Sequence, residues 1–170
     1  MRRGGAYNRL VEPHWHDAPD TGFSTQHGGR WNAPGSFGVL YLNRTVRMAR
    51  IQLADHPYEI EDLDPTTQHD LVEVDVAQTD ALDLVSDEGL AAVGLPHTYP
   101  LADDGRPVQH AQCQPIGQAA YDEPLPAIAC RSAAAGATQT DEELAVFDRA
   151  AGIATQTARR PFADWYLGER

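Results

Sequence analysis

The chain contains one short segment in which several chemistry-bearing residue types occur together, Gly28-Gly29-Arg30-Trp31-Asn32. Two consecutive glycines let the backbone turn tightly and approach a ligand closely. Arg30 carries a permanent charge on a planar fork that suits phosphate or carboxylate, while Trp31 and Asn32 add a flat ring and an amide. This combination indicates a site for an anionic ligand with flat rings, such as a nucleotide. A well-packed loop with a buried Trp and a surface Arg has the same composition.

Two polar side chains that follow this loop occur on elements that could bring them beside it. Tyr41 lies in the apolar run Phe37–Leu42, which is typical of a central strand. Thr45 is a suitable N-cap for a helix over Val46–Ala54. Gln52 lies on that helix near the edge of its apolar stripe, so it could point under Tyr41. Without a ligand, Tyr41 would be a core aromatic and Gln52 a solvated helix residue.

Other candidates for chemistry are few. Ser132 follows the apolar run Pro126–Cys130, so a strand would deliver its hydroxyl to the edge of a sheet. The segment His14-Trp15-His16 has no Cys or acid at metal-ligand spacing, and we expect no metal site. Cys113 and Cys130 also lack ligand spacing, and we expect free thiols in a reducing, cytoplasmic compartment.

The composition restricts the class of partner. The chain has 170 residues, a formal net charge of -12 and thirteen basic residues, all of them Arg. An acidic surface argues against direct nucleic-acid binding, which relies on basic groups meeting phosphates. No apolar run approaches the length of a membrane span, and the segment after Met1 has no apolar region of a secretory signal. We therefore expect a cytoplasmic protein that contacts neither nucleic acid nor membrane.

The remaining pattern predicts one domain over residues 1–170. Strands are expected over Ala6–Glu12, Phe37–Leu42, Leu71–Val76, Pro126–Cys130 and Glu143–Phe147, and helices over Val46–Ala54, Glu88–Val93, Val108–Tyr121 and Thr155–Tyr166. Pro115 is expected to begin or kink the third helix, and Pro57–Asp70 has the composition of an acidic linker. Because strands and helices do not alternate regularly, the pattern favours an α+β fold.

The stretch Tyr7–Leu53 resembles the start of a RES domain, the toxin family named for an Arg, a Glu and a Ser. In that family an early Arg, a GGRWN-like loop and a strand Tyr follow one another. Here these positions are Arg9, Arg30 and Tyr41. The loop together with the spaced Tyr makes the resemblance fairly specific.

The resemblance continues downstream and covers about residues 7–147. Cys130–Ala134 resembles the Ser motif of the family, with Ser132 as its Ser, and Glu143–Phe147 resembles the strand that follows. The resemblance implies an ADP-ribosyltransferase-like fold. This is a split, mostly antiparallel sheet with flanking helices and a nucleotide cleft between its halves.

One position departs from the family pattern, because the Glu of the family falls at Gln52. Three explanations remain open: no carboxylate is needed, another acid replaces it, or the chain is an inactivated variant. Asp55, Glu59 and Glu61 are the nearest acids in sequence. If no acid replaces it, Gln52→Glu should raise turnover at least about ten-fold, since one electrostatic group is worth roughly 10²–10³ in rate.

The resemblance implies NAD⁺ as a substrate, broken at its nicotinamide–ribose bond, and no true cofactor. The implied NAD⁺-binding residues are Arg9, Gly29, Arg30, Trp31, Asn32, Tyr41 and Ser132, and the implied catalytic residues are Arg30, Tyr41, Gln52 and Ser132. Arg30 would grip the pyrophosphate, Tyr41 would stack on the nicotinamide or ribose, and Ser132 would bind a ribose hydroxyl or the carboxamide. An acid at position 52 would offset the positive charge that develops on the ribose.

The resemblance therefore implies a toxin that depletes NAD⁺ and is covered at its cleft by a cognate antitoxin protein. Two alternatives remain open at this level. One is a protein ADP-ribosyltransferase that uses the same site with a different acceptor. The other is a weakened or inactive homologue with Gln52 that binds a nucleotide or a partner. A homo-oligomer within the toxin–antitoxin complex is also left open.

Overall fold

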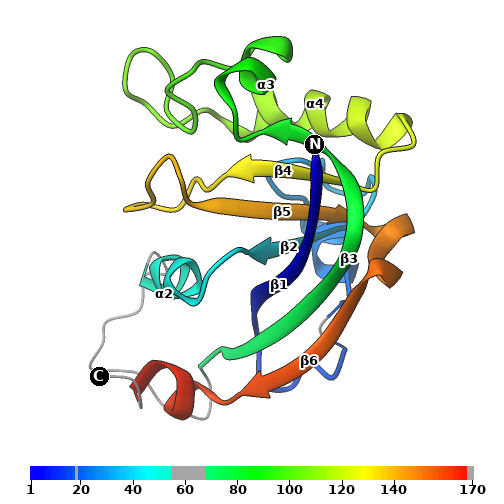
Figure 1. Cartoon of the computed structure of the whole chain (residues 1–170), viewed down its shortest axis with the longest axis vertical. Helices are drawn as coiled ribbons and strands as arrows, with labels where there is room; N and C mark the ends of the chain where they lie inside the picture. The colour runs from blue at the N-terminus through cyan, green and yellow to red at the C-terminus, as the bar shows by residue number, and fades with distance from the viewer. Residues whose placement is uncertain (18, 55–67, 168–170) are drawn as a thin grey trace.

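The computed structural model describes residues 1–17, 19–54 and 68–167 (Figure 1). Its strands are β1 (Arg2–Val11), β2 (Val39–Asn43), β3 (Asp70–Leu84), β4 (Ala127–Arg131), β5 (Glu142–Phe147) and β6 (Ala154–Arg160). Its helices are α1 (Gly22–His27), α2 (Val46–Ala54), α3 (Asp87–Ala92) and α4 (His110–Asp122), with a 3-10 turn η2 (Asp148–Ile153) and a π-helical turn η3 (Ala163–Leu167). These elements combine helices with one mixed sheet, so the α+β expectation is confirmed.

The six strands form one strongly bent sheet in the order β1-β2-β5-β4-β3-β6. Of the strand pairs described, only β3–β4 is parallel. The bend arises because β3 serves two sets of neighbours: its first part pairs with β1 and β6, and Ala81–Leu84 pair with β4. In Figure 1, β4, β5 and β2 run across the view while β1, β3 and β6 run down it. The expected split, mostly antiparallel sheet is confirmed.

The strands β2, β5 and β4 have two different faces because successive side chains point to opposite sides. Leu40, Leu42, Leu144 and Val146 point into the space between the two parts of the sheet and form the central core with β3. The opposite side is called the outer face here; from β2 and β5 it bears Val39, Tyr41, Asn43, Glu143, Ala145 and Phe147. The space between the halves is thus filled by apolar side chains, and the polar candidates lie on the outer face instead.

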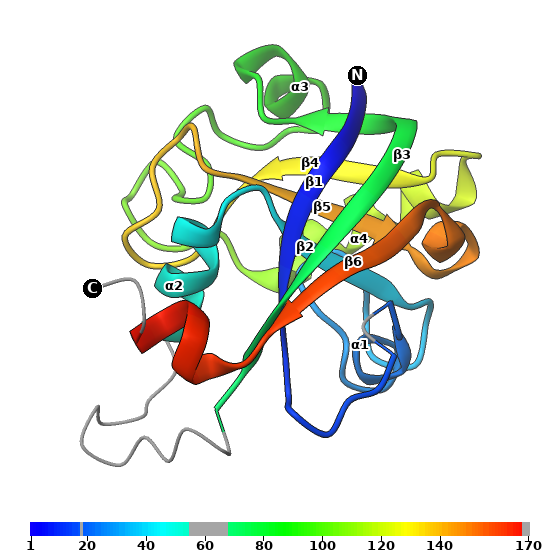
Figure 2. The ribbon, with the colours of Figure 1, turned by 60° about the horizontal axis from the view of Figure 1, so that its bottom comes forward.

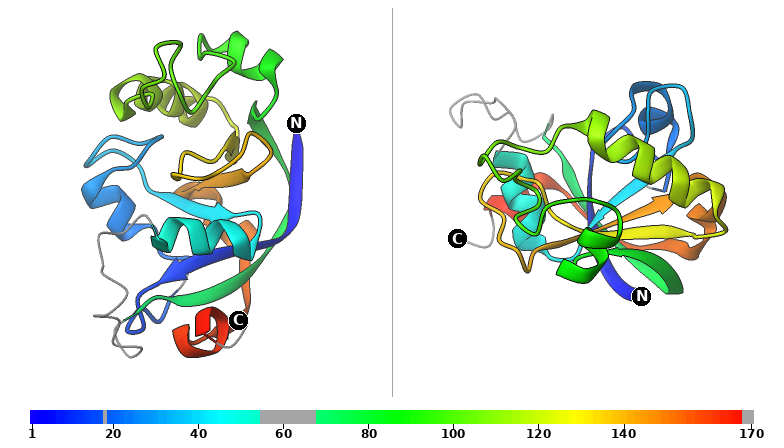
Figure 3. Two further views of the ribbon diagram at one scale, coloured as in Figure 1. Left: turned by 90° about the vertical axis from the view of Figure 1, so that its left-hand side faces the viewer. Right: turned by 90° about the horizontal axis from the view of Figure 1, so that it is seen from above.

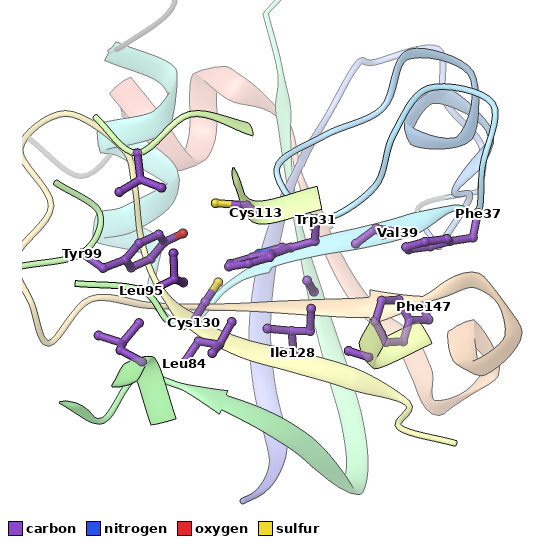
Figure 4. Packing of buried hydrophobic residues seen from close by; sticks show 14 residues of the cluster. Trp31, Phe37, Val39, Leu84, Leu95, Tyr99, Cys113, Ile128, Cys130 and Phe147 are labelled. Atoms are coloured by element: carbon purple, nitrogen blue, oxygen red, sulfur yellow. The ribbon is translucent and has the colours of Figure 1, made fainter. Parts of the chain in front are cut away.

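Helix α4 covers the outer face (Figure 3, right). A tryptophan fills the layer between the helix and the sheet. In Figure 4 the indole of Trp31 lies between Cys113 of α4 and Cys130 of β4, with Tyr99 at one end. Both cysteines are buried free thiols, as the sequence predicts. A close approach of the helix is possible because Gly117 faces the carbonyl oxygen of Trp31, where a Cβ would overlap it.

Helix α2 has the bounds that the sequence predicts, Val46–Ala54. The Thr45 hydroxyl accepts a hydrogen bond from the backbone N–H of Met48 at 3.2 Å, which is the expected N-terminal cap. Its apolar side packs on the turn η3 near Phe162 and Trp165, and Figure 2 shows α2 and η3 side by side. This packing fixes the side of α2 that is turned towards the sheet.

The predicted closing helix over Thr155–Tyr166 is wrong. Ala154–Arg160 form the strand β6 instead, which pairs antiparallel with Leu71–Val76 of β3, and η3 follows after Pro161. The exposed edge of β3 offers backbone partners that a helix would leave unused. Its acids also match the arginines of β6, as in the 2.7 Å ion pair between Arg159 and Asp70.

Other differences concern element bounds. Pro115 lies inside α4 rather than at its start, because the helix already begins at His110. β1 starts at Arg2, and β3 runs on to Leu84 through a polar stretch. Most of the expected linker lies outside the described residues, and Asp70 opens β3. No described helix is long and apolar enough to span a membrane.

Candidate functional site

Tyr41 and the glycine loop hold each other in place. The Tyr41 hydroxyl accepts a hydrogen bond from the backbone N–H of Trp31 at 3.1 Å and donates one to Oδ1 of Asn32 at 3.0 Å. A Cβ on Gly29 would lie 2.5 Å from the hydroxyl oxygen, so glycine is required for this approach. Burial raises the pKa of Tyr41, which therefore stays a protonated donor at neutral pH.

The loop residues Trp31 and Asn32 were expected to contact NAD⁺, but both side chains are fully buried. Asn32 donates to the backbone carbonyls of Ser24 at 2.7 Å and Phe37 at 2.9 Å. Trp31 packs in the outer-face core. The structure therefore places both beneath the loop, where they hold its backbone in position.

Replacing Tyr41 by phenylalanine is expected to lower the free energy of unfolding by about 1–3 kcal/mol. The substitution leaves the N–H of Trp31 and the Oδ1 of Asn32 without their partner in a buried setting. Urea denaturation measures the change. The control is Tyr121→Phe, which removes one hydrogen bond to Asp148 and should cost less. Equal costs for the two variants would show that Tyr41 does not organise the loop.

A row of paired residues crosses the outer face at the end nearest α2. Asn8 of β1 pairs with Asn43 of β2, Asn43 pairs with Glu143 of β5, and Glu143 pairs with Cys130 of β4. Side chains at directly opposite positions of neighbouring strands are close enough to contact one another. Ser132 follows two residues after Cys130, so the end of β4 delivers it to this row.

Hydrogen bonds at this row join residues of α2, β2 and β5 with Ser132, which follows β4. Oε1 of Glu143 accepts from the Ser132 hydroxyl and, at 3.3 Å, from Nε2 of Gln52. Oε1 of Gln52 in turn accepts from Nδ2 of Asn43 at 2.7 Å. The structure thus brings together Ser132 and Gln52, which lie 80 positions apart in the sequence, through a carboxyl group that neither belongs to.

Glu143 is the functional candidate that sequence reasoning missed. The sequence indicated only that it opens the strand Glu143–Phe147. A usable signal was the period-two alternation of β5, which puts Glu143 on the same buried side as Ala145 and Phe147. A carboxyl at such a buried position indicates a functional role, because burial disfavours its charged form.

The surroundings of Glu143 act on its pKa in two directions. Burial raises the pKa above the ordinary value of a glutamate, while Ser132, Arg30 and Gln52 each favour the charged form. The nearest acids considered from sequence, Asp55, Glu59 and Glu61, lie outside the described residues. Among the described residues, Glu143 is the carboxyl in contact with both Gln52 and Ser132.

Arg30 lies on the loop above this row. Its side chain lines a cavity of about 450 Å³ together with residues 107–111, and Nη1 donates to the carbonyl oxygen of Val108 at 3.2 Å. Its positive charge favours the ionised forms of both Tyr41 and Glu143. Arg30 is therefore close enough to act electrostatically on the row, and it also faces open space in which an anion could bind.

A second cavity of about 420 Å³ shares one lining residue, Pro107, with the first. Its wall includes residues 133–139, the loop that directly follows Ser132. The backbone N–H of Ser132 donates to Asp141 at 2.7 Å, which closes the base of that loop. Arg30 and the loop after Ser132 thus border neighbouring cavities.

Arg9, the remaining predicted residue, is not brought to this place. It has the same strand parity as Tyr7 and Val11, which point into the central core. Its Nη1 donates to the carbonyl oxygen of Asp20 at 3.0 Å, and its guanidinium lies over the ring of Trp15. Burial lowers its pKa to about 10. In the described residues, no group of three or more His, Cys, Asp or Glu could hold a metal ion.

Comparison with known proteins identifies the family and the fold of the chain. No curated protein matches the chain significantly. Among solved structures, the crystal structure of the M. tuberculosis MbcT–MbcA toxin–antitoxin complex is similar, with a TM-score of 0.72 at 21% identity over 94% of this chain and 84% of that chain. At this identity the likeness concerns the fold. A family model, the RES domain, matches residues 6–165, and the chain therefore belongs to the RES domain family.

Proposed function

We propose that this chain is the toxin of a toxin–antitoxin pair and consumes NAD⁺ by breaking its nicotinamide–ribose bond. The observation that carries the proposal is the convergence of Arg30, Tyr41, Ser132 and Glu143 on one end of the outer face. Membership of the RES domain family supports it. A dinucleotide offers a pyrophosphate, a flat cationic ring and a ribose, which are matched by a guanidinium, a phenol and a carboxyl.

The proposed reaction breaks the bond between C1′ of the ribose and the ring nitrogen of nicotinamide. The electron pair leaves with nicotinamide, and C1′ becomes an oxocarbenium-like cation. An oxygen of water then bonds to C1′ and its proton passes to the solvent, so the products are ADP-ribose, nicotinamide and H⁺. Arg30 holds the pyrophosphate, and Tyr41 lies against the nicotinamide ring. The Ser132 hydroxyl, fully buried, orients Glu143 rather than the substrate.

The partner in this proposal is an antitoxin protein that covers the cavities beside Arg30 and thereby keeps NAD⁺ out. Support comes from the similar fold of MbcT, which was solved in complex with MbcA. A net charge of -12 also suits a partner with a basic contact surface. The proposed compartment is the cytoplasm, where NAD⁺ is available.

The carboxyl beside Gln52 favours an active enzyme over a weakened homologue, because the site does not lack an acid. A protein ADP-ribosyltransferase would differ only in the nucleophile that attacks C1′. The acceptor is therefore identified from the reaction products.

The purified chain, incubated with NAD⁺ and no other protein, is expected to release nicotinamide. Chromatography would identify the other product as ADP-ribose in plain buffer, or ADP-ribose 1-phosphate if inorganic phosphate is the preferred acceptor. Release that requires an added protein extract and labels a protein would support the transferase alternative. The absence of nicotinamide under all three conditions would refute NAD⁺ cleavage.

A further inference from the structure

The carboxyl at the proposed site comes from strand β5 rather than from helix α2. Position 52 of α2 holds an amide, and its Nε2 lies 3.3 Å from Oε1 of Glu143. Asn43, the cross-strand partner of Glu143, holds the same amide from its other end. Gln52 and Glu143 therefore share one location, with the amide supplied by the helix and the acid by the strand.

One oxygen of this carboxyl is held by the protein and the other is presented outward. Both described donors, the Ser132 hydroxyl and the Gln52 amide, contact Oε1. Oε2 accepts no hydrogen bond from a described residue, yet it is not among the fully buried polar atoms that lack a partner. The 8% exposure of Glu143 is therefore consistent with an Oε2 that reaches the surface. Close by, Oδ1 of Asn43 is buried without a donor from the described residues.

We propose that Glu143 is the catalytic carboxylate of this site, with its Oε2 facing the ribose. The inference rests on the proposed NAD⁺ reaction and names the anion which that reaction needs. As the bond from C1′ to nicotinamide breaks, positive charge moves from the nicotinamide ring onto the ribose. A fixed negative charge at that point stabilises the transition state more than the bound substrate, and one such group is worth roughly 10²–10³ in rate.

The protonation state of Glu143 connects this role to pH. Glu143 interacts electrostatically with four other titratable groups of the described residues. These are Arg30 and Tyr99 from loops, Tyr41 from β2 and Cys130 from β4. The pKa values of the two tyrosines and of Cys130 are raised, so Arg30 and Glu143 are the pair that carries charge. Since burial raises the pKa of Glu143 as well, activity should fall as pH drops through that raised pKa.

The raised pKa of Glu143 also affects the stability of the folded chain, and this effect distinguishes a catalytic role from a structural one. A raised pKa means that the folded chain binds the proton of Glu143 more tightly than the unfolded chain does. The contribution of Glu143 to the free energy of unfolding is therefore largest below the ordinary pKa of a glutamate. It decreases as pH rises through the raised value. Glu143→Gln removes this cost, so the thermal midpoint near neutral pH should not fall.

The test compares kcat for NAD⁺ consumption and its pH profile in four proteins: wild type, Glu143→Gln, Gln52→Glu and the double variant. Glu143→Gln should lower kcat about 10²–10³-fold. The double variant exchanges acid and amide between helix and strand, and it should recover at least about ten-fold over Glu143→Gln. Its acid limb should move to lower pH, because position 52 is less buried.

Gln52→Glu alone should not produce the at least ten-fold gain expected for a site without an acid, because two touching carboxyls share a proton and add no second charge. This expectation replaces the gain predicted for a site without an acid. The matched control is Glu142→Gln, the same change one residue earlier. Glu142 points to the other face, where it pairs with Arg3 at 2.9 Å, so kcat per folded molecule should be unchanged.

A wild-type rate retained by Glu143→Gln, or no recovery in the double variant, would overturn the assignment. If wild type releases no nicotinamide, the role of Glu143 is tested by comparing the affinities for NAD⁺ and NADH by calorimetry. An anion near the ribose should favour NAD⁺, with its cationic ring, over neutral NADH, and Glu143→Gln should abolish that preference. A lost preference would support the role of Glu143 while the proposed reaction fails. An equal preference in wild type and variant would refute both.

Discussion

Replacing Arg30 by lysine is expected to weaken NAD⁺ binding by about 10- to 100-fold, because hydrogen bonds to charged groups contribute about 1.5–3 kcal/mol. The guanidinium offers two parallel donors in a rigid plane, whereas an ammonium is a point charge. Arg30 is half-buried at the wall of a cavity, so its guanidinium borders the space in which the pyrophosphate would bind. Isothermal titration calorimetry with NAD⁺ measures the loss.

The control for this measurement is Arg2→Lys, which makes the same exchange at an exposed position of β1. Its NAD⁺ affinity should equal that of wild type. Arg30→Ala should bind still more weakly, and it also removes a charge that favours ionised Glu143, so its acid limb should move to higher pH. An unchanged affinity in Arg30→Lys would rule out a bidentate contact with the pyrophosphate.

Replacing Gly117 by alanine is expected to lower the free energy of unfolding by about 2 kcal/mol or more. A Cβ at this position would overlap the carbonyl oxygen of Trp31, which is backbone and has no rotamer to escape to. Overpacking costs up to about 3 kcal/mol and occasionally more. The better helix propensity of alanine returns only about 1 kcal/mol. Helix α4 must therefore move away from the glycine loop.

Urea denaturation measures this cost, and NAD⁺ affinity reports the displaced loop. The control is Gly152→Ala in η2, where a Cβ meets no atom within 4 Å. Its stability should stay within about 0.5 kcal/mol of wild type, as for surface substitutions generally. Equal stabilities for the two variants would mean that α4 does not rest on the loop through Gly117.

Local patterns in the sequence were sufficient for several elements. The apolar stripe after Thr45 predicted α2 with its observed bounds, because capping and helical periodicity are short-range signals. The glycine–arginine loop and the apolar run around Tyr41 were recognisable for the same reason. The helix predicted for the closing segment was wrong because β6 is stabilised by pairing with the edge of β3, which is far away in the chain.

The sequence by itself determined the family, the strand and helix that carry Tyr41 and Gln52, and the absence of an acid at position 52. Only the tertiary structure showed that the carboxyl of Glu143 lies beside Gln52. The register between β2 and β5 sets Asn43 opposite Glu143, and the end of β4 brings in Ser132. Such contacts depend on which strands become neighbours, and the energy that selects neighbours comes from burying the whole core rather than from any local segment.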